Sequence, residues 1–359
     1  MTAGTSGPAA IAPVSGITAY RRLSRRRGLI LVGLLVLLVG SVVVDVVSGP
    51  STMSVADSVR TIFRPWSSTV VEQAIIWDIR LPMAVMAVVV GAALAVAGVQ
   101  MQTILNNPLA EPFTLGIAAA ASFGAATAIV FGVGVLSISG LFLTAANAWL
   151  CAMLACLAIQ SLSLLRGATA ETMILLGIAL VFLFSALLSL IQFTASEQAL
   201  QQVVFWTMGS MTKADWLRIA IVAAVLIIVV PMCARAAWRL TALRMGDDRA
   251  ASLGVAVRRL RLTVLLGVSV LAATAVAFVG TIGFVGLVGP HVARMLVGED
   301  QRYLVPASML CGALLLSVTS IVSKIVMPGV VIPVGIITAL VGVPFFIVIV
   351  FTQRRRIWS

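Results

Sequence analysis

Residues 81–116 read LPMAVMAVVVGAALAVAGVQMQTILNNPLAEPFTLG, and this stretch decides the fold. Residues 81–101 are uncharged and almost wholly apolar, and they reach the about 20 residues that a helix needs to cross a membrane. Residues 106–112 then bring two asparagines, two prolines and a glutamate, and proline interrupts a helix because it lacks a backbone donor. The stretch therefore predicts a membrane-spanning helix followed by an abrupt break.

The composition extends this prediction to the whole chain. Of its 359 residues, 61% are hydrophobic and only 10% are charged, whereas soluble domains carry about 25% charged residues. A water-soluble fold cannot bury so much apolar surface, and the long alternation of apolar and polar residues that marks a membrane barrel is missing. We therefore expect an all-α polytopic membrane protein.

Apolar runs place about ten transmembrane helices along the chain. They cover about residues 28–48, 81–101, 114–134, 141–164, 172–193, 216–237, 262–279, 283–297, 304–323 and 334–351. Residues 49–79 are polar enough for an external loop, and residues 194–215 are amphipathic but too polar to span. We expect a disordered cytoplasmic tail at 1–27, one transmembrane domain at 28–353 and a cytoplasmic tail at 354–359.

The basic residues orient these spans. Most of the 24 lysines and arginines lie in three clusters, at residues 21–27, 235–261 and 354–356, and the formal net charge is +12. Basic residues of membrane proteins stay on the cytoplasmic side, so the clusters place both termini in the cytoplasm. Because long uncharged runs separate the clusters, no nucleic-acid partner is expected, and the partner of the apolar surface is membrane lipid.

The sequence lacks residues that several classes of function require. Ion-coupled transporters bury ionisable residues at mid-membrane, but Asp45 and Arg294 fall near span ends. Neither Lys213 nor Lys324 follows a glycine, as a phosphate-binding loop requires, so any ATP would bind another chain. The single histidine, His291, and four cysteines without ligand spacing predict no metal site, and no catalytic cluster of acids or nucleophiles occurs.

Three segments, at residues 79–117, 244–262 and 280–310, followed by residues 333–346, together resemble the permease subunit of FecCD-type ABC importers. These importers carry iron-siderophores, haem or cobalamin. The resemblance implies ten spans in a bacterial plasma membrane and a second permease chain, identical or homologous, with the pathway between the two. It also implies two cytoplasmic ATPase subunits that bind ATP and Mg, an external substrate-binding protein, and no cofactor on this chain.

The basic segment at about 238–261 matches the coupling loop of the family, which docks on the ATPase. The matching residues are Gly246, Asp247, Asp248, Ala250, Ser252, Leu253 and Gly254. From the residues alone, the acid pair suits the start of a short helix and Gly254 suits its end. An ordinary basic loop on the cytoplasmic side accounts for them equally well.

The break after the second span is the most recognisable motif of the resemblance. We interpret Asn106, Asn107, Pro108, Glu111 and Pro112 as a cytoplasmic turn and hinge beside the pathway, not as substrate ligands. The asparagines would satisfy free backbone groups, Pro108 would end one helix and Pro112 would begin the next. Glu111 would then precede that new helix, where a carboxylate is favourable.

Two further sets of residues belong to the predicted pathway. The density of glycine between Gly280 and Pro290 predicts a kinked or broken helix. The pathway residues there are Gly283, Phe284, Gly286, Pro290 and His291, of which His291 is expected to be a hydrogen-bonded structural residue. Gln198, Gln201 and Gln202 form a polar stripe that matches an outer gate, although a solvated face explains the stripe equally well.

The sequence therefore predicts a non-enzymatic transport subunit of an ATP-driven importer, with ferric siderophore as the preferred substrate. Haem and cobalamin are the alternatives within the same family. A channel or secondary transporter that works without ATP is the alternative class.

Overall fold

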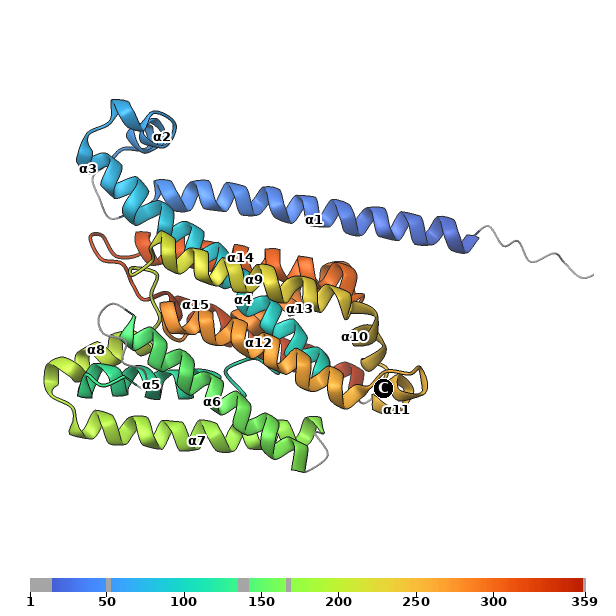
Figure 1. Ribbon diagram of the computed structural model, residues 1–359. Coiled ribbons are helices and arrows are strands. Elements are labelled where there is room, and N and C mark those ends of the chain that lie inside the picture. Colours follow the sequence, from blue (N-terminus) through green and yellow to red (C-terminus); the bar gives the residue numbers. More distant parts are fainter. Residues whose placement is uncertain (1–14, 50–52, 135–141, 166–168, 358–359) are drawn as a thin grey trace, which may run out of the picture.

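The computed structural model describes residues 15–49, 53–134, 142–165 and 169–357, and these residues form helices and connections without strands (Figure 1). Within these described residues, seven helices are long and apolar enough to cross a membrane, and three shorter apolar helices, at 117–131, 285–297 and 334–348, accompany them. Together these are the ten helices that the sequence predicts. The all-α polytopic fold is confirmed.

The helices follow one another with short connections, and their bounds agree with the predicted spans to within a few residues at most ends. The longer ones are α1 (Ser15–Val47), α4 (Leu81–Ile104), α5 (Ile117–Phe131), α6 (Leu143–Leu165), α7 (Ala170–Thr194), α9 (Trp216–Arg235), α12 (Val257–Val279), α13 (Val285–Val297), α14 (Gln301–Ile325) and α15 (Val334–Ile357). The shorter ones are α2 (Val55–Phe63), α3 (Val70–Gln73), α8 (Glu197–Thr207), α10 (Ala237–Leu243) and α11 (Asp247–Ser252).

Helix α4 lies at the centre of the bundle and packs against α14, α12, α13 and α9. Glycines make this packing close, because small residues let helix backbones approach each other. A Cβ atom built on Gly98 would lie 1.8 Å from the carbonyl oxygen of Gly286 in α13. A Cβ atom on Gly91 would lie 2.4 Å from the carbonyl oxygen of Gly312 in α14. The core of the protein therefore depends on backbone contact.

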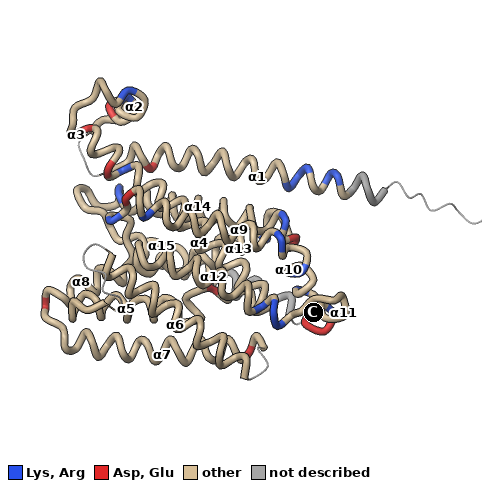
Figure 2. Tube along the Cα trace, in the orientation of Figure 1, with Lys and Arg blue, Asp and Glu red and all other residues tan. Residues whose placement is uncertain are grey.

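The two ends of the bundle differ in charge. Lys and Arg gather at the end that holds α10, α11 and the first turns of α1, while the middles of the helices are mostly uncharged (Figure 2). By the positive-inside rule this end is cytoplasmic, and α2, α3 and α8 lie at the outer end. The described chain begins and ends on the side of α11, in agreement with the predicted topology (Figure 1).

Both predicted tails were drawn too long. Residues 15–27 are helical and extend α1, whereas residues 1–14 lie outside the described part of the chain. Arginine is a good helix former, and this extension is also held to α14, since Arg27 lies 5.2 Å from the ring centroid of Tyr303. At the other end α15 continues to Ile357, through the basic residues assigned to the second tail.

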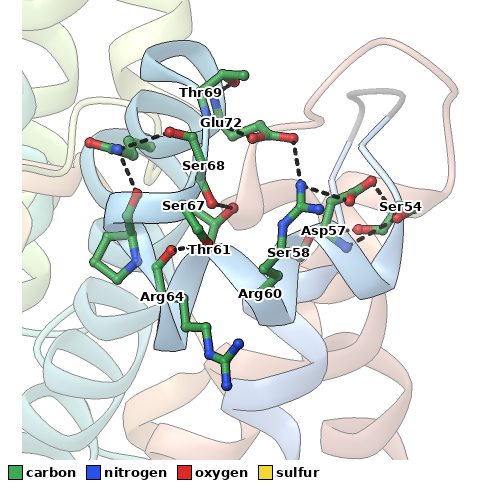
Figure 3. A network of polar contacts seen from close by, with 12 residues as sticks. Ser54, Asp57, Ser58, Arg60, Thr61, Arg64, Ser67, Ser68, Thr69 and Glu72 are labelled. Carbon is green, nitrogen blue, oxygen red and sulfur yellow. Dashed lines mark hydrogen bonds and ion pairs between the residues drawn. The ribbon is translucent and has the colours of Figure 1, made fainter.

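The external segment between α1 and α4 is ordered by its own polar side chains (Figure 3). Ser54 caps α2, and Thr69 and Glu72 form a capping box at α3. The Arg60 guanidinium bridges Asp57 at 3.1 Å and Glu72 at 3.3 Å. A helical turn, η2 (Ala74–Arg80), then continues without interruption into α4. The predicted loop is thus a folded outer cap.

Candidate functional site

The break after α4 begins as the asparagines predict. Asn106 adopts φ 44°, the left-handed conformation that ends many helices. The Asn107 amide donates to the Gln102 carbonyl at 3.1 Å, and the Asn107 side chain accepts from the Leu109 amide at 2.9 Å. Pro108 follows directly and prevents the helix from continuing. Asn107 thus satisfies backbone groups at the turn, and Asn106 contributes through its backbone conformation. The role of Asn106, Asn107 and Pro108 as a hinge stays a prediction.

The sequence predicts that this connection is a turn at the cytoplasmic surface. The connection instead folds back into the bundle. A Cβ atom on Gly286 would lie 3.3 Å from Pro112 and 3.1 Å from the Leu94 carbonyl, and Leu94 is more than two helical turns inside the end of α4. Helix α5 starts only at Ile117, so Pro112 does not begin it. Non-helical backbone at this depth is tolerated because it is buried in protein.

Glu111 also differs from its prediction. Its side chain is buried, and its carboxylate accepts a hydrogen bond from the backbone of Phe284. Phe284 is the N-cap of α13, with φ 67°. The carboxylate therefore lies at the start of α13 and not of α5, because the connection has turned back toward α13. A carboxylate at this place satisfies a free amide and suits the helix dipole.

A second break separates α12 from α13 and meets the first through the contact between Glu111 and Phe284. Gly280 adopts φ 76°, and the Thr281 hydroxyl donates to the Thr207 carbonyl at 2.5 Å, which ties the break to the end of α8. Pro290 and His291 lie inside α13, and the His291 ring packs edge-on against Phe345 of α15 at 5.8 Å. The recorded contact of His291 is thus aromatic packing, where a hydrogen bond was predicted.

The two breaks and α15 line a cavity of about 860 Å³. Its lining residues are Glu111, Phe113, Thr207, Met208, Thr281, Gly283, Phe284, Gly335, Ile336, Ala339, Leu340, Val343 and Pro344. Glu111 is the one charged residue among them. Leu340 and Phe113 are 67% and 40% exposed, so the cavity lies open on the surface of the single chain. Of the predicted pathway residues, Glu111, Gly283 and Phe284 line this opening. The others do not line it; they are Asn106, Asn107, Pro108, Pro112, Gly286, Pro290 and His291.

Helix α8 lies over a second cavity at the outer end. This cavity measures about 540 Å³, and its lining includes Gln198, Gln201, Gln202 and Lys213. The three glutamines are exposed along α8 and share this cavity, as the predicted polar stripe requires. The segment 194–215 thus forms a short helix at the outer mouth. Its role as a gate stays a prediction.

The predicted coupling residues form a compact cytoplasmic helix, α11. Gly246 and Gly254 flank it with φ 103° and 81°, and the Val255 amide closes it by donating to the Ala250 carbonyl at 3.0 Å. Ala250 is buried, whereas Leu253 is 50% exposed. Asp247, Asp248 and Ser252 also lie at the surface. An apolar side chain on an exposed cytoplasmic turn is available to a partner protein.

Charged contacts tie α11 and its flanks to the membrane helices. Arg261 of α12 donates to the Asp247 carboxylate at 3.0 Å and to the carbonyl of Ile104, the last residue of α4, at 2.7 Å. Arg244 pairs with Glu299 at 2.8 Å, and burial is the main cause that lowers the pKa of Arg244. Sequence reasoning treated these arginines only as orienting charges.

An ion pair near the outer end was also missed. Lys324 of α14 lies 2.7 Å from Asp45 of α1, and both side chains are buried. No local pattern in the sequence pairs these two residues, because they lie 279 positions apart. Within the described residues no cluster of three or more potential metal ligands occurs.

Known proteins place this architecture in a family. The model of the FecCD transport family matches residues 29–352. The chain belongs to the FecCD transport family. An ABC transporter permease of Methanocaldococcus jannaschii is 41% identical over 290 residues, which are 79% of this chain and 83% of the relative. The vitamin B12 import permease BtuC of Vibrio parahaemolyticus is 36% identical over 281 residues, or 78% and 84% of the two chains.

Solved structures agree with this assignment. An ABC transporter of the metal-chelate type, in an inward-facing conformation, matches with a TM-score of 0.77 and 32% identity over 90% of this chain and 99% of that chain. Further relatives, 34% to 37% identical, are named as hemin, molybdate and iron chelatin import permeases. The protein is therefore a multi-pass ABC importer permease, a transport component whose ATPase is a separate chain.

Proposed function

We propose that this permease imports a ferric siderophore across a bacterial plasma membrane. A second permease chain, identical or homologous, would complete the pathway, two cytoplasmic ATPase subunits would bind ATP and Mg, and an external binding protein would deliver the substrate. The cavity at the two breaks carries this proposal. Its volume of about 860 Å³ lies within the range of about 300–1,000 Å³ that small-molecule sites occupy.

The charge of this cavity supports a bulky chelate over a small oxyanion. Its lining holds one acid, Glu111, and no lysine or arginine among the described residues. Anions such as molybdate are bound by cationic side chains or by several convergent amides. A chelate encloses its metal in an organic shell. It can therefore move past small and apolar side chains and needs no strong binding site in the pathway. The names of the iron chelatin relative and of the metal-chelate neighbour favour the same class.

The open side of the cavity supports a two-chain pathway. Leu340 of α15 is 67% exposed and Phe182 of α7 is 72% exposed, on the helices that flank the two breaks. A second permease chain against these faces would enclose the cavity. Alternating access would then follow when ATP draws the two ATPase subunits together and the helices α11 of the two permeases move with them.

The outer face offers a place for the binding protein. The outer cap is braced by its own side-chain contacts, and Figure 3 shows Arg64 extending from this network. Arg64 is exposed on this cap, and an exposed basic side chain would attract an acidic protein surface.

Uptake by reconstituted vesicles tests this proposal. The vesicles would hold the permease, its ATPase and its binding protein, and they would be offered a ferric hydroxamate siderophore, haemin, cobalamin or molybdate. We expect ATP-dependent uptake of the siderophore. Uptake of haemin or cobalamin in its place would support the alternative substrates named from the sequence, and uptake of molybdate alone would contradict the argument from charge.

A further inference from the structure

Two chains of polar contacts connect the flanks of α11 to the inner end of α4. The first runs through Arg261. Its guanidinium contacts both oxygens of the Asp247 carboxylate, at 3.0 and 3.1 Å, and its Nε donates to the Ile104 carbonyl at 2.7 Å. One planar side chain therefore joins the first residue of α11 to the last residue of α4.

The second chain of contacts runs through Glu299, in the connection between α13 and α14. Its carboxylate lies 2.8 Å from Arg244, which precedes α11, and 3.0 Å from Arg294. The Arg294 guanidinium then donates to the Gln102 side chain of α4 at 3.0 Å. The flank before α11 is thus also linked to α4, two residues from the point that Arg261 holds.

These contacts converge where movement would matter most for the pathway. The end of α4 leads directly into the break at 105–116, and the Gln102 amide also donates to the Gly286 carbonyl in α13 at 3.4 Å. Helix α4 is buried and close-packed, so its inner end moves together with the helices that it contacts and does not bend independently of them. A displacement of α11 therefore reaches both breaks through α4.

The exposed fractions of the two partners fit a contact that transmits movement and does not only stabilise the fold. The Arg261 side chain is 4% exposed, whereas the Asp247 side chain is 54% exposed. Arg261 is thus enclosed by the protein, while its acidic partner lies on the exposed cytoplasmic helix. Arginine suits this task because its planar fork holds two acceptors in a fixed geometry.

We infer that Arg261 is a positioning residue that couples the movement of α11 to the inner end of α4, with Glu299 and Arg294 as a parallel branch. This inference rests on the proposed function, since it takes α11 as the contact with the ATPase. It assigns a role to Arg261, which the sequence analysis treated only as one of the orienting charges. Arg261 acts through α4 and contacts no substrate.

The test uses the complex of the permease with its ATPase and needs no substrate. Phe113, which is 40% exposed at the cavity, is replaced in a Phe113→Cys reporter and labelled with a maleimide, while the four native cysteines are buried. We expect ATP with vanadate to change the labelling rate of the reporter. In Arg261→Gln we expect this ATP-dependent change to shrink about fivefold or more, the lower end of typical coupling between sites, while ATP hydrolysis continues.

Controls separate coupling from folding and from the proposed function. Arg302→Gln removes the same charge from an exposed arginine at the same end of the bundle and should leave the response intact. Where Arg261→Gln does not fold, Asp247→Ala removes the same contact from its exposed side and gives the same test. An unchanged response, or loss of hydrolysis and response together, overturns the inference. A reporter that ignores ATP in the otherwise unaltered complex contradicts the proposed function instead.

Discussion

Two ion pairs at opposite ends of the bundle show how differently the molecule uses charge. Near the outer end, the Lys324 and Asp45 side chains are 2% and 0% exposed and lie 2.7 Å apart. At the cytoplasmic end, Arg261 is 4% exposed but its partner Asp247 is 54% exposed. A pair sealed among helices can only hold them together. A pair with one partner in water can change its length when a bound protein moves that partner.

The outer pair should give the largest loss of stability when one member is removed. Lys324→Met leaves the Asp45 carboxylate buried without its cation, and breaking a buried pair in this way costs about 3–5 kcal/mol. Thermal unfolding of the purified permease measures the effect. Lys213→Met, the same substitution at an exposed site, serves as the control. Equal unfolding temperatures for the two variants would contradict a structural role for the pair.

The backbone contact between α4 and α13 should be almost as sensitive, although it involves no charge. In Gly98→Ala the new Cβ atom would meet the Gly286 carbonyl oxygen at 1.8 Å, and such overpacking costs about 3 kcal/mol at the upper end of its usual range. The yield of folded permease and its unfolding temperature report the loss. Gly33→Ala in α1 is the matched control, because nothing lies within 4 Å of a Cβ atom there. If the Gly98→Ala variant is as stable as the unaltered permease, α4 and α13 do not pack backbone to backbone at this point.

The carboxylate at the start of α13 should have an intermediate effect. Glu111→Ala leaves the Phe284 amide at the start of α13 without this acceptor, and the loss of such a hydrogen bond costs about 1–3 kcal/mol. Glu111→Gln keeps an acceptor oxygen and should recover most of this stability. Thermal unfolding of both variants gives the comparison. If the two lose the same stability, Glu111 does not act through this hydrogen bond.

The cytoplasmic pair should contribute least to stability. Asp247→Ala removes a partner that is half exposed to water, and Arg261 keeps its hydrogen bond to the Ile104 carbonyl, so we expect a loss of only about 1 kcal/mol. The unfolding temperature should stay close to that of the unaltered permease, while the response of the pathway to ATP should shrink. A large fall in unfolding temperature would show that this pair stabilises the fold as the outer pair does. The two pairs would then not differ in role.

The sequence predicts most of this architecture, because apolar runs of about 20 residues interrupted by charge have few other solutions in a membrane. Asn106, Asn107 and Pro108 likewise predict where α4 ends, since their local chemistry decides it. The sequence does not predict that residues 105–116 turn back into the bundle, because that depends on Gly286 of a distant helix. The sequence also does not predict that Asp45 meets Lys324 or that Asp247 meets Arg261, because packing between helices brings each pair together.

We expect this chain to transport only when a separate ATPase acts on its cytoplasmic end. The decisive measurement is uptake of a ferric siderophore by vesicles that hold the permease and binding protein, with and without the ATPase subunits. We expect uptake with the ATPase and ATP, and none when the ATPase is left out. Undiminished uptake without the ATPase would contradict the claim and favour a channel or a secondary transporter.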